Sequence, residues 1–191
     1  MSRISLNLVV HNEEERLPEF LAHILPLVDE VIAVVQQSTD RTLELLRPVA
    51  DVLIEHPHYG YAEASRQAAY DASTGDWVLI LSPDERLSAY AQQHLRSWVA
   101  NPNVDAYALR EVTTIGGALF EDAYHPRLFR KGTATMTSEI HTEIQCATGR
   151  LVNAGTAVAI EHHKTLEEQR IDNERYARLN SPSIPLPAVN Q

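Results

Sequence analysis

The chain has 191 residues, of which 44% are hydrophobic and 22% are charged, a composition that is ordinary for a single globular domain with a sizeable core. Its formal net charge of −10 argues against a nucleic-acid partner and against electrostatic attachment to anionic lipid, because both need a basic surface. The single cysteine, Cys146, excludes an internal disulfide, and with no signal-peptide pattern after Met1 we expect a cytoplasmic protein.

The first hundred residues alternate between short apolar runs and helix-like segments. Strands are predicted at 4–10, 30–35, 51–55 and 77–81, and helices at 12–25, 42–47, 61–73 and 88–100. Strands that alternate with helices indicate a mostly parallel sheet with right-handed crossovers. Asn12 and Glu15 have the spacing of a capping box, which predicts that the first helix starts at Asn12.

The character of the chain changes after residue 105. Short strands are predicted at 107–114, 117–120, 124–130 and 157–162, followed by a charged helix at 166–179. The last segment, 181–191, holds three prolines and no periodicity, so we expect a flexible tail. No linker divides the rest, and we therefore predict one domain over residues 1–180.

The fourth predicted strand carries the most informative side chains. Its apolar run ends at Pro83, because proline cannot donate to a strand ladder, and Asp84 and Glu85 follow at once. Ligands of open α/β sheets bind at the carboxyl ends of the strands, where a carboxylate can share a divalent cation with a diphosphate. Neighbouring side chains of an extended chain point apart, so we expect Asp84 to face the ligand and Glu85 to face elsewhere.

Seven fragments stand in a characteristic order along the chain: 9–14, 34–42, 64–67, 75–85, 126–130, 140–143 and 161–165. Together they resemble glycosyltransferase family 2, in particular its short bacterial enzymes that act on lipopolysaccharide core or related glycans. The resemblance extends over roughly residues 4–178. It implies an α/β fold of the GT-A type, a Rossmann-like three-layer sandwich with a mostly parallel central sheet and a smaller antiparallel C-terminal part.

The resemblance also implies a reaction and its residues. The expected activity is inverting transfer of a sugar from a nucleotide-sugar donor, in the first place a UDP-sugar, to a glycan or lipid-linked acceptor, with Mg²⁺ or Mn²⁺. Asp84 would hold the metal and assist catalysis, His141 would be a further metal or phosphate ligand, and Glu143 the base, with Glu139 as the alternative. The residues expected to contact the nucleotide are Asn12, Glu13, Ser38, Asp40, Arg66, Arg127 and Arg130.

Each of these residues also has an ordinary structural interpretation. Asn12, Ser38 and Asp40 are typical helix-capping residues, and Arg66 fits a solvated helix face. Arginines at 127 and 130 suit an edge strand as well as a phosphate. The pair His162 and His163 cannot face one site from a strand, so at most one of them approaches the acceptor or the diphosphate.

Two departures from the family pattern affect the nucleotide side. Ser82 stands where the family's first acid of an Asp-x-Asp motif is expected, and Gln36 or Gln37 stands where an Asp usually contacts the nucleobase. A domain that binds a nucleotide-sugar or glycan without turnover is therefore the main alternative. A nucleotidyltransferase would need a basic glycine-rich loop where 11–15 is acidic, and a small assembly module is a third alternative.

The apolar runs 31–35 and 77–81 are too short to cross a bilayer, so no transmembrane segment is expected. Attachment to the inner membrane would then be peripheral. Little chain remains after the sheet to build an acceptor side. A homodimer or a membrane-associated partner would complete that side, and the sequence leaves both open.

Overall fold

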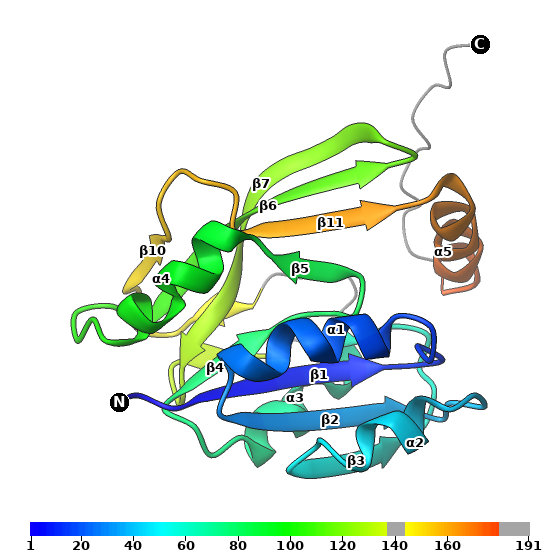
Figure 1. Cartoon of the computed structure of the whole chain (residues 1–191), viewed down its shortest axis with the longest axis horizontal. Helices are drawn as coiled ribbons and strands as arrows, with labels where there is room; N and C mark the ends of the chain where they lie inside the picture. Colours follow the sequence, from blue (N-terminus) through cyan, green and yellow to red (C-terminus); the bar gives the residue numbers. More distant parts are fainter. Residues whose placement is uncertain (137–143, 180–191) are drawn as a thin grey trace.

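The computed structural model describes residues 1–136 and 144–179 (Figure 1). His141, Glu143, the alternative base Glu139 and the expected tail lie outside the described residues. The elements follow in this order: β1 (Ile4–Val10), α1 (Leu17–Ile24), η1 (Leu25–Leu27), β2 (Glu30–Gln36), α2 (Thr42–Leu46), β3 (Val52–His56), α3 (Glu63–Ala72), β4 (Trp77–Ile80), β5 (Glu85–Leu87), α4 (Ala89–Val99), β6 (Ala106–Ile115), β7 (Ala118–Arg130), β8 (Ala134–Thr135), β9 (Gln145–Cys146), β10 (Leu151–Asn153), β11 (Ile160–Lys164) and α5 (Leu166–Arg178).

One large sheet organises the fold. Among the described residues its strand order is β3-β2-β1-β4-β7-β6-β11-β5, with β10 beside β6, and β8 and β9 form a separate small antiparallel sheet. The first four strands in that order are parallel, β7 is antiparallel to both of its neighbours, and β11 is parallel to β6. The expected α/β fold class, with a mostly parallel central sheet and a smaller antiparallel part, is confirmed.

Helices cover both faces of the sheet, which makes three layers (Figure 1). On one face, Leu6 and Leu8 of β1 share a core cluster with Phe20 of α1 and Trp98 of α4. On the other face, Ile32 and Val34 of β2 pack with Ala69 of α3. A strand between two helical layers must be apolar on both sides, and every residue of β2 is accordingly buried. No helix in the described part of the chain is long and apolar enough to cross a membrane.

Two predicted strands, 117–120 and 124–130, form the single long strand β7. It pairs with β6 across a tight turn at Gly116 and Gly117, both of which have positive φ. Polar residues such as Glu121 and Asp122 interrupt the apolar pattern but sit on a half-exposed ribbon, where they cost little. The prediction of two separate strands is thereby corrected.

The start of the first helix also differs from the prediction. Helix α1 begins at Leu17 and has no side-chain cap. Asn12 instead has a left-handed backbone, with φ of 53°, and its Oδ1 accepts a hydrogen bond from the Thr39 amide at 2.8 Å. The capping-box prediction is therefore wrong, because Asn12 connects the loop after β1 to the loop after β2.

A buried polar network holds the beginning of β4 in place. The amide and hydroxyl of Thr74 donate to the Glu30 carboxylate at 2.8 and 2.6 Å, and Ser5 Oγ donates to the same carboxylate. The Gly75 amide donates to Ser5 Oγ at 2.9 Å. Burial alone would raise the pKa of Glu30, but the hydrogen bonds from Ser5 and Thr74 hold it below its usual value. The network joins β1 and β2 to the turn that enters β4.

Replacing Gly75 by alanine tests this packing. A Cβ at this position would lie 2.6 Å from Ser5 Oγ and 3.0 Å from the carbonyl oxygen of Arg3. We expect Gly75→Ala to lower the free energy of unfolding by about 1–3 kcal/mol, measured by urea titration. Because Ser5 Oγ causes part of the clash, Ser5→Ala and Gly75→Ala should cost less together than the sum of their single effects. Strictly additive losses would count against this explanation.

Candidate functional site

A cleft of about 760 Å³ opens at the carboxyl ends of β1, β2 and β4. Its size is that of a small-molecule site, and its place is where open α/β sheets bind ligands. One wall comes from the loops after these strands and from α3. The opposite wall comes from β6, β7, β11 and α5. Among the residues expected to act, those that line it are Asn12, Glu13, Arg66, Asp84 and Arg127.

Asp84 and His162 meet at the mouth of the cleft. Asp84 Oδ2 lies 3.1 Å from His162 Nε2, and the two side chains keep 24% and 14% of their surface exposed. Burial alone would raise the pKa of Asp84, but the hydrogen bond and charge of His162, with Lys164 and Arg16, hold it well below its usual range. Burial would lower the pKa of His162, yet the bonds to Asp84 and Glu111 raise it to about 10. The two groups therefore form an ion pair at neutral pH.

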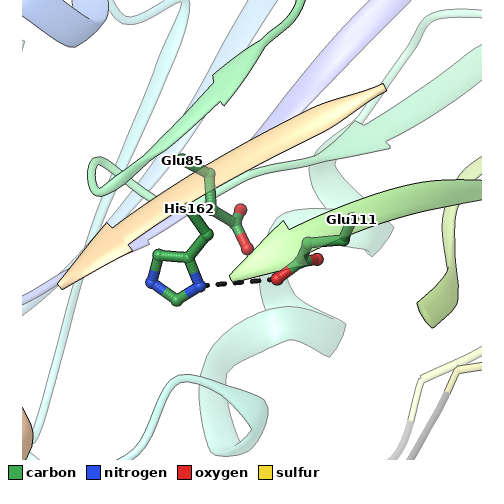
Figure 2. Close-up of side chains that lie close together, drawn as sticks. All are labelled: Glu85, Glu111 and His162. Atoms are coloured by element: carbon green, nitrogen blue, oxygen red, sulfur yellow. Dashed lines mark ion pairs between the residues drawn. The ribbon is translucent and has the colours of Figure 1, made fainter. Parts of the chain in front are cut away.

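Beneath this pair lies a buried array of charges. Nη2 of Arg127 donates to Glu85 Oε1 at 2.7 Å and to Glu111 Oε2 at 2.8 Å. Figure 2 shows Glu111 and His162 pointing toward one another, with Glu85 beside them. Burial, opposed by Arg127 and reinforced by Glu111, raises the pKa of Glu85. Burial would also raise the pKa of Glu111, but His162 and Arg127 hold it well below its usual range.

The short strand β5 explains why Glu85 and His162 are neighbours. β5 pairs with β11 in antiparallel register, with Glu85 opposite His162. The expectation that Glu85 faces away from the site is wrong, because Glu85 lines the same cleft as Asp84 and stands beside His162. The two carboxylates differ in their partners, since Asp84 bonds to His162 while Glu85 bonds to Arg127 and to the Ser82 amide.

Two groups of side chains in the cleft come close enough to hold a divalent cation, and one of them fits better than the other. Oxygen and nitrogen atoms of Glu85, Glu111 and His162 lie within 4.8 Å of one another, but Arg127 already bonds to both carboxylates. At the mouth, Asp84 Oδ2 and His162 Nε2 are 3.1 Å apart. Two ligands at about 2.1 Å and a right angle, as in an octahedral site, are about 3.0 Å apart. Asp84 and a neutral His162 therefore fit adjacent positions around one ion.

Arg66 brings an unengaged positive charge to the cleft. It stands on α3, and among the described residues its guanidinium makes no hydrogen bond or salt bridge, whereas its backbone oxygen accepts a bond from Asn7. Burial lowers its pKa, and the charge of Arg127 acts in the same direction. A half-buried cation without a hydrogen-bonded anion is costly, so this place favours an anionic ligand.

Ser38 and Asp40 do not line the cleft. Ser38 Oγ accepts a hydrogen bond from the Asn12 amide at 3.0 Å. Asp40 accepts from the Glu14 amide at 3.0 Å and from the amide of Thr42, the first residue of α2, at 2.9 Å. Both side chains thus brace the loops that carry Asn12 and Glu13.

Arg130 does not line the cleft, which corrects the expectation that it contacts the nucleotide. Its Nε donates to Asp105 at 3.0 Å, and its guanidinium stacks over Trp77 at 4.7 Å, at the amino end of β4. Residues three apart on a strand stand about 10 Å apart, and Arg127 bonds to Glu85 and Glu111 whereas Arg130 bonds to Asp105, so the two arginines do not share a site.

Glu111 is the site residue that the sequence analysis missed. A signal was present, because a carboxylate inside a run of β-branched and apolar residues must find a partner when buried. His162 faces the cleft while His163 bonds to Thr114, as expected from strand alternation. The proposed roles of His141 and Glu143 concern residues outside the described part of the chain and stay predictions.

Known proteins resemble this chain in sequence and in fold. The family model described as glycosyl transferase family 2 matches residues 5–154. A TPR repeat-containing protein of Synechococcus elongatus is 36% identical over 131 residues, 68% of this chain and 32% of that protein. An uncharacterized glycosyltransferase of Rickettsia typhi is 30% identical over 112 residues, 59% of this chain and 38% of that protein. The chain spans 32% to 44% of the length of such relatives.

Two solved structures have a similar fold. TarS residues 1–349 of S. aureus, in complex with UDP-GlcNAc, superposes with a TM-score of 0.67 at 15% identity, over 94% of this chain and 67% of that one. The mannosyltransferase PcManGT of Pyrobaculum calidifontis, in complex with GDP-Man and Mn²⁺, gives 0.58 at 16% identity, over 96% and 66%. At such identities the likeness concerns the fold alone.

Removing Arg127 tests the buried charge array. Arg127→Ala would leave the carboxylates of Glu85 and Glu111 buried without their cation, so we expect a loss of about 3–5 kcal/mol in the free energy of unfolding. Arg110→Ala is a matched control, because Arg110 pairs with Asp122 at the surface of the same hairpin. Urea titrations of both variants should show a far smaller loss for the control, and equal losses would be inconsistent with a buried network.

Proposed function

The chain belongs to glycosyltransferase family 2, and from this premise we propose that it transfers a sugar from a nucleotide-sugar donor to a hydroxyl of a glycan or lipid-linked acceptor, with inversion and with help from Mn²⁺ or Mg²⁺. The observation that carries the proposal is the pair of Asp84 and His162 at the mouth of a cleft that also contains the unpaired Arg66. A carboxylate, an imidazole and a guanidinium in that arrangement suit a metal-bound diphosphate.

Each side chain would have a distinct part in handling the donor. Asp84 is ionised throughout the neutral range, because its pKa is held well below the usual value. It would bind the cation together with His162 once Nε2 has lost its proton. Arg66 would contact the diphosphate from the α3 side, and Asn12 and Glu13 would line the nucleoside end. A bound divalent cation supplies charge neutralisation for the leaving diphosphate.

Deprotonation of the acceptor needs a separate base. We assign it to Glu143, with Glu139 as the alternative, and His141 as a further ligand of the metal or phosphate. The carboxylates of Glu85 and Glu111 do not compete for this role, because Arg127 engages both of them. A positioned general base is typically worth ~10²–10⁴-fold in rate.

The donor class has support from the structural neighbours, but they do not select one base. TarS is in complex with UDP-GlcNAc and PcManGT with GDP-Man and Mn²⁺. We take a UDP-sugar as the first donor to test. Ser82, where the family's first acid is expected, favours the alternative of a domain that binds a nucleotide-sugar without turnover.

The metal role of Asp84 is tested by following UDP release from UDP-sugars with Mn²⁺ and candidate acceptors. We expect Asp84→Asn to lower the rate by about 100-fold or more, since charge neutralisation at the leaving group is worth several kcal/mol. Asp71→Asn, which removes an exposed carboxylate from α3, should leave the rate unchanged. If Asp84→Asn turned over as fast as the unmodified protein, the metal role would be refuted. Binding of UDP-sugar without any product would support the non-catalytic alternative.

Arg66 gives an independent test of diphosphate binding. Charge-assisted hydrogen bonds contribute roughly 1.5–3 kcal/mol, so Arg66→Ala should weaken UDP binding by about 10- to 100-fold in calorimetric titrations. Arg41→Ala is the control, because Arg41 is exposed and pairs with Glu14 outside the cleft. An unchanged UDP affinity in Arg66→Ala would remove Arg66 from the donor site.

A further inference from the structure

We propose that Glu111 is a positioning residue that fixes the His162 ring so that Nε2 faces Asp84 and the cleft. The inference rests on the metal-assisted function proposed above, and it adds a residue that acts on the metal site through another side chain. Glu111 also lines the cleft, but its carboxylate is engaged by Arg127. Its effect would pass through the imidazole.

The contacts of one ring nitrogen of His162, Nδ1, support this inference. Glu111 Oε1 lies 3.4 Å from His162 Nδ1 (Figure 2). The hydroxyl of Thr113 lies 3.3 Å from each of these atoms and donates to Glu111, which leaves its lone pair to accept from a protonated His162 Nδ1. A proton on Nδ1 would therefore point toward a hydroxyl and a carboxylate.

The second ring nitrogen of His162, Nε2, faces Asp84. His162 Nε2 lies 3.1 Å from Asp84 Oδ2. A cation that binds between Asp84 and His162 would displace the proton from Nε2, and the carboxylate at Nδ1 would keep the remaining proton on Nδ1. The lone pair then stays on Nε2, the nitrogen beside Asp84, as a metal ligand requires.

Glu111 is itself held firmly enough to orient a ring. Only 3% of the residue is exposed, and its second oxygen, Oε2, accepts from Arg127 at 2.8 Å. Glu111 and Thr113 lie on β6, and His162 lies opposite Thr113 on the neighbouring strand β11. Two paired strands therefore set the distance between the carboxylate and the imidazole.

The test measures Mn²⁺ binding directly, by the loss of the free-ion signal in electron paramagnetic resonance titrations of the full chain with UDP present. Loss of the outer partner of a ligating histidine typically costs about 10- to 100-fold in metal affinity, and we expect that loss for Glu111→Gln. Glu161→Gln removes an exposed carboxylate from β11 and should bind Mn²⁺ like the unmodified chain.

A double-mutant cycle separates positioning from general structural damage. If Glu111 acts through His162, then Glu111→Gln should change Mn²⁺ affinity by no more than about twofold when His162→Ala is already present. Thr113→Val keeps the pair of Arg127 and Glu111 but removes the bridging hydroxyl, so it should weaken Mn²⁺ binding in the same direction. It serves as the second probe if Glu111→Gln unfolds, which thermal melts will reveal.

The outcomes distinguish this inference from the proposed function. If Asp84→Asn and His162→Ala weaken Mn²⁺ binding while Glu111→Gln and Thr113→Val do not, the positioning role of Glu111 is overturned and the metal site stands. A loss in Glu111→Gln that persists undiminished in the His162→Ala background also overturns it. If the unmodified chain binds Mn²⁺ no better than Asp84→Asn does, both the metal-assisted function and the positioning role of Glu111 are refuted.

Discussion

The site depends on one largely buried arginine between two buried carboxylates. Arg127, on β7, bonds to Glu85 on β5 and to Glu111 on β6, and each of these carboxylates would be costly to bury alone. The strands around the floor of the cleft are therefore joined by charge as well as by apolar packing. Because the guanidinium satisfies the two inner carboxylates, the remaining acid, Asp84, is left for the pair with His162 at the mouth.

The cleft is assembled from two parts of the chain that are far apart in sequence. Asp84 follows β4 in the parallel half of the sheet, whereas His162 comes from β11 in the later half. The two atoms that fit one ion thus meet through the pairing of β11 with β5, the short strand that begins directly after Asp84. The loops after β1 and β2 need no such closure, because Asn12, Ser38 and Asp40 already bind them to one another.

The local features of this fold could be predicted from the sequence, and its long-range contacts could not. Apolar runs and helical periodicity located the strands and helices of the first hundred residues, and the proline after β4 placed Asp84 at the carboxyl end of a strand. Strand β5 was missed because its three residues have no pattern of their own and are defined by pairing with β11. Glu111 was missed for the same reason, since its partners lie on other strands. Arg130 was misplaced because a resemblance between fragments does not report how far along a strand each residue lies from the cleft.

The edge of the large sheet has a consequence for association between copies of the chain. The sheet ends at β5, a strand of only three residues that includes Arg86, whose guanidinium bonds to the carbonyl oxygens of Pro83 and Glu85. So short an edge, with a charged side chain folded back on its own backbone, presents few free amide and carbonyl groups to an incoming strand. Two copies that associate on this side would have to do so through their side chains, since the edge offers no template on which the sheet of one copy could continue into the other.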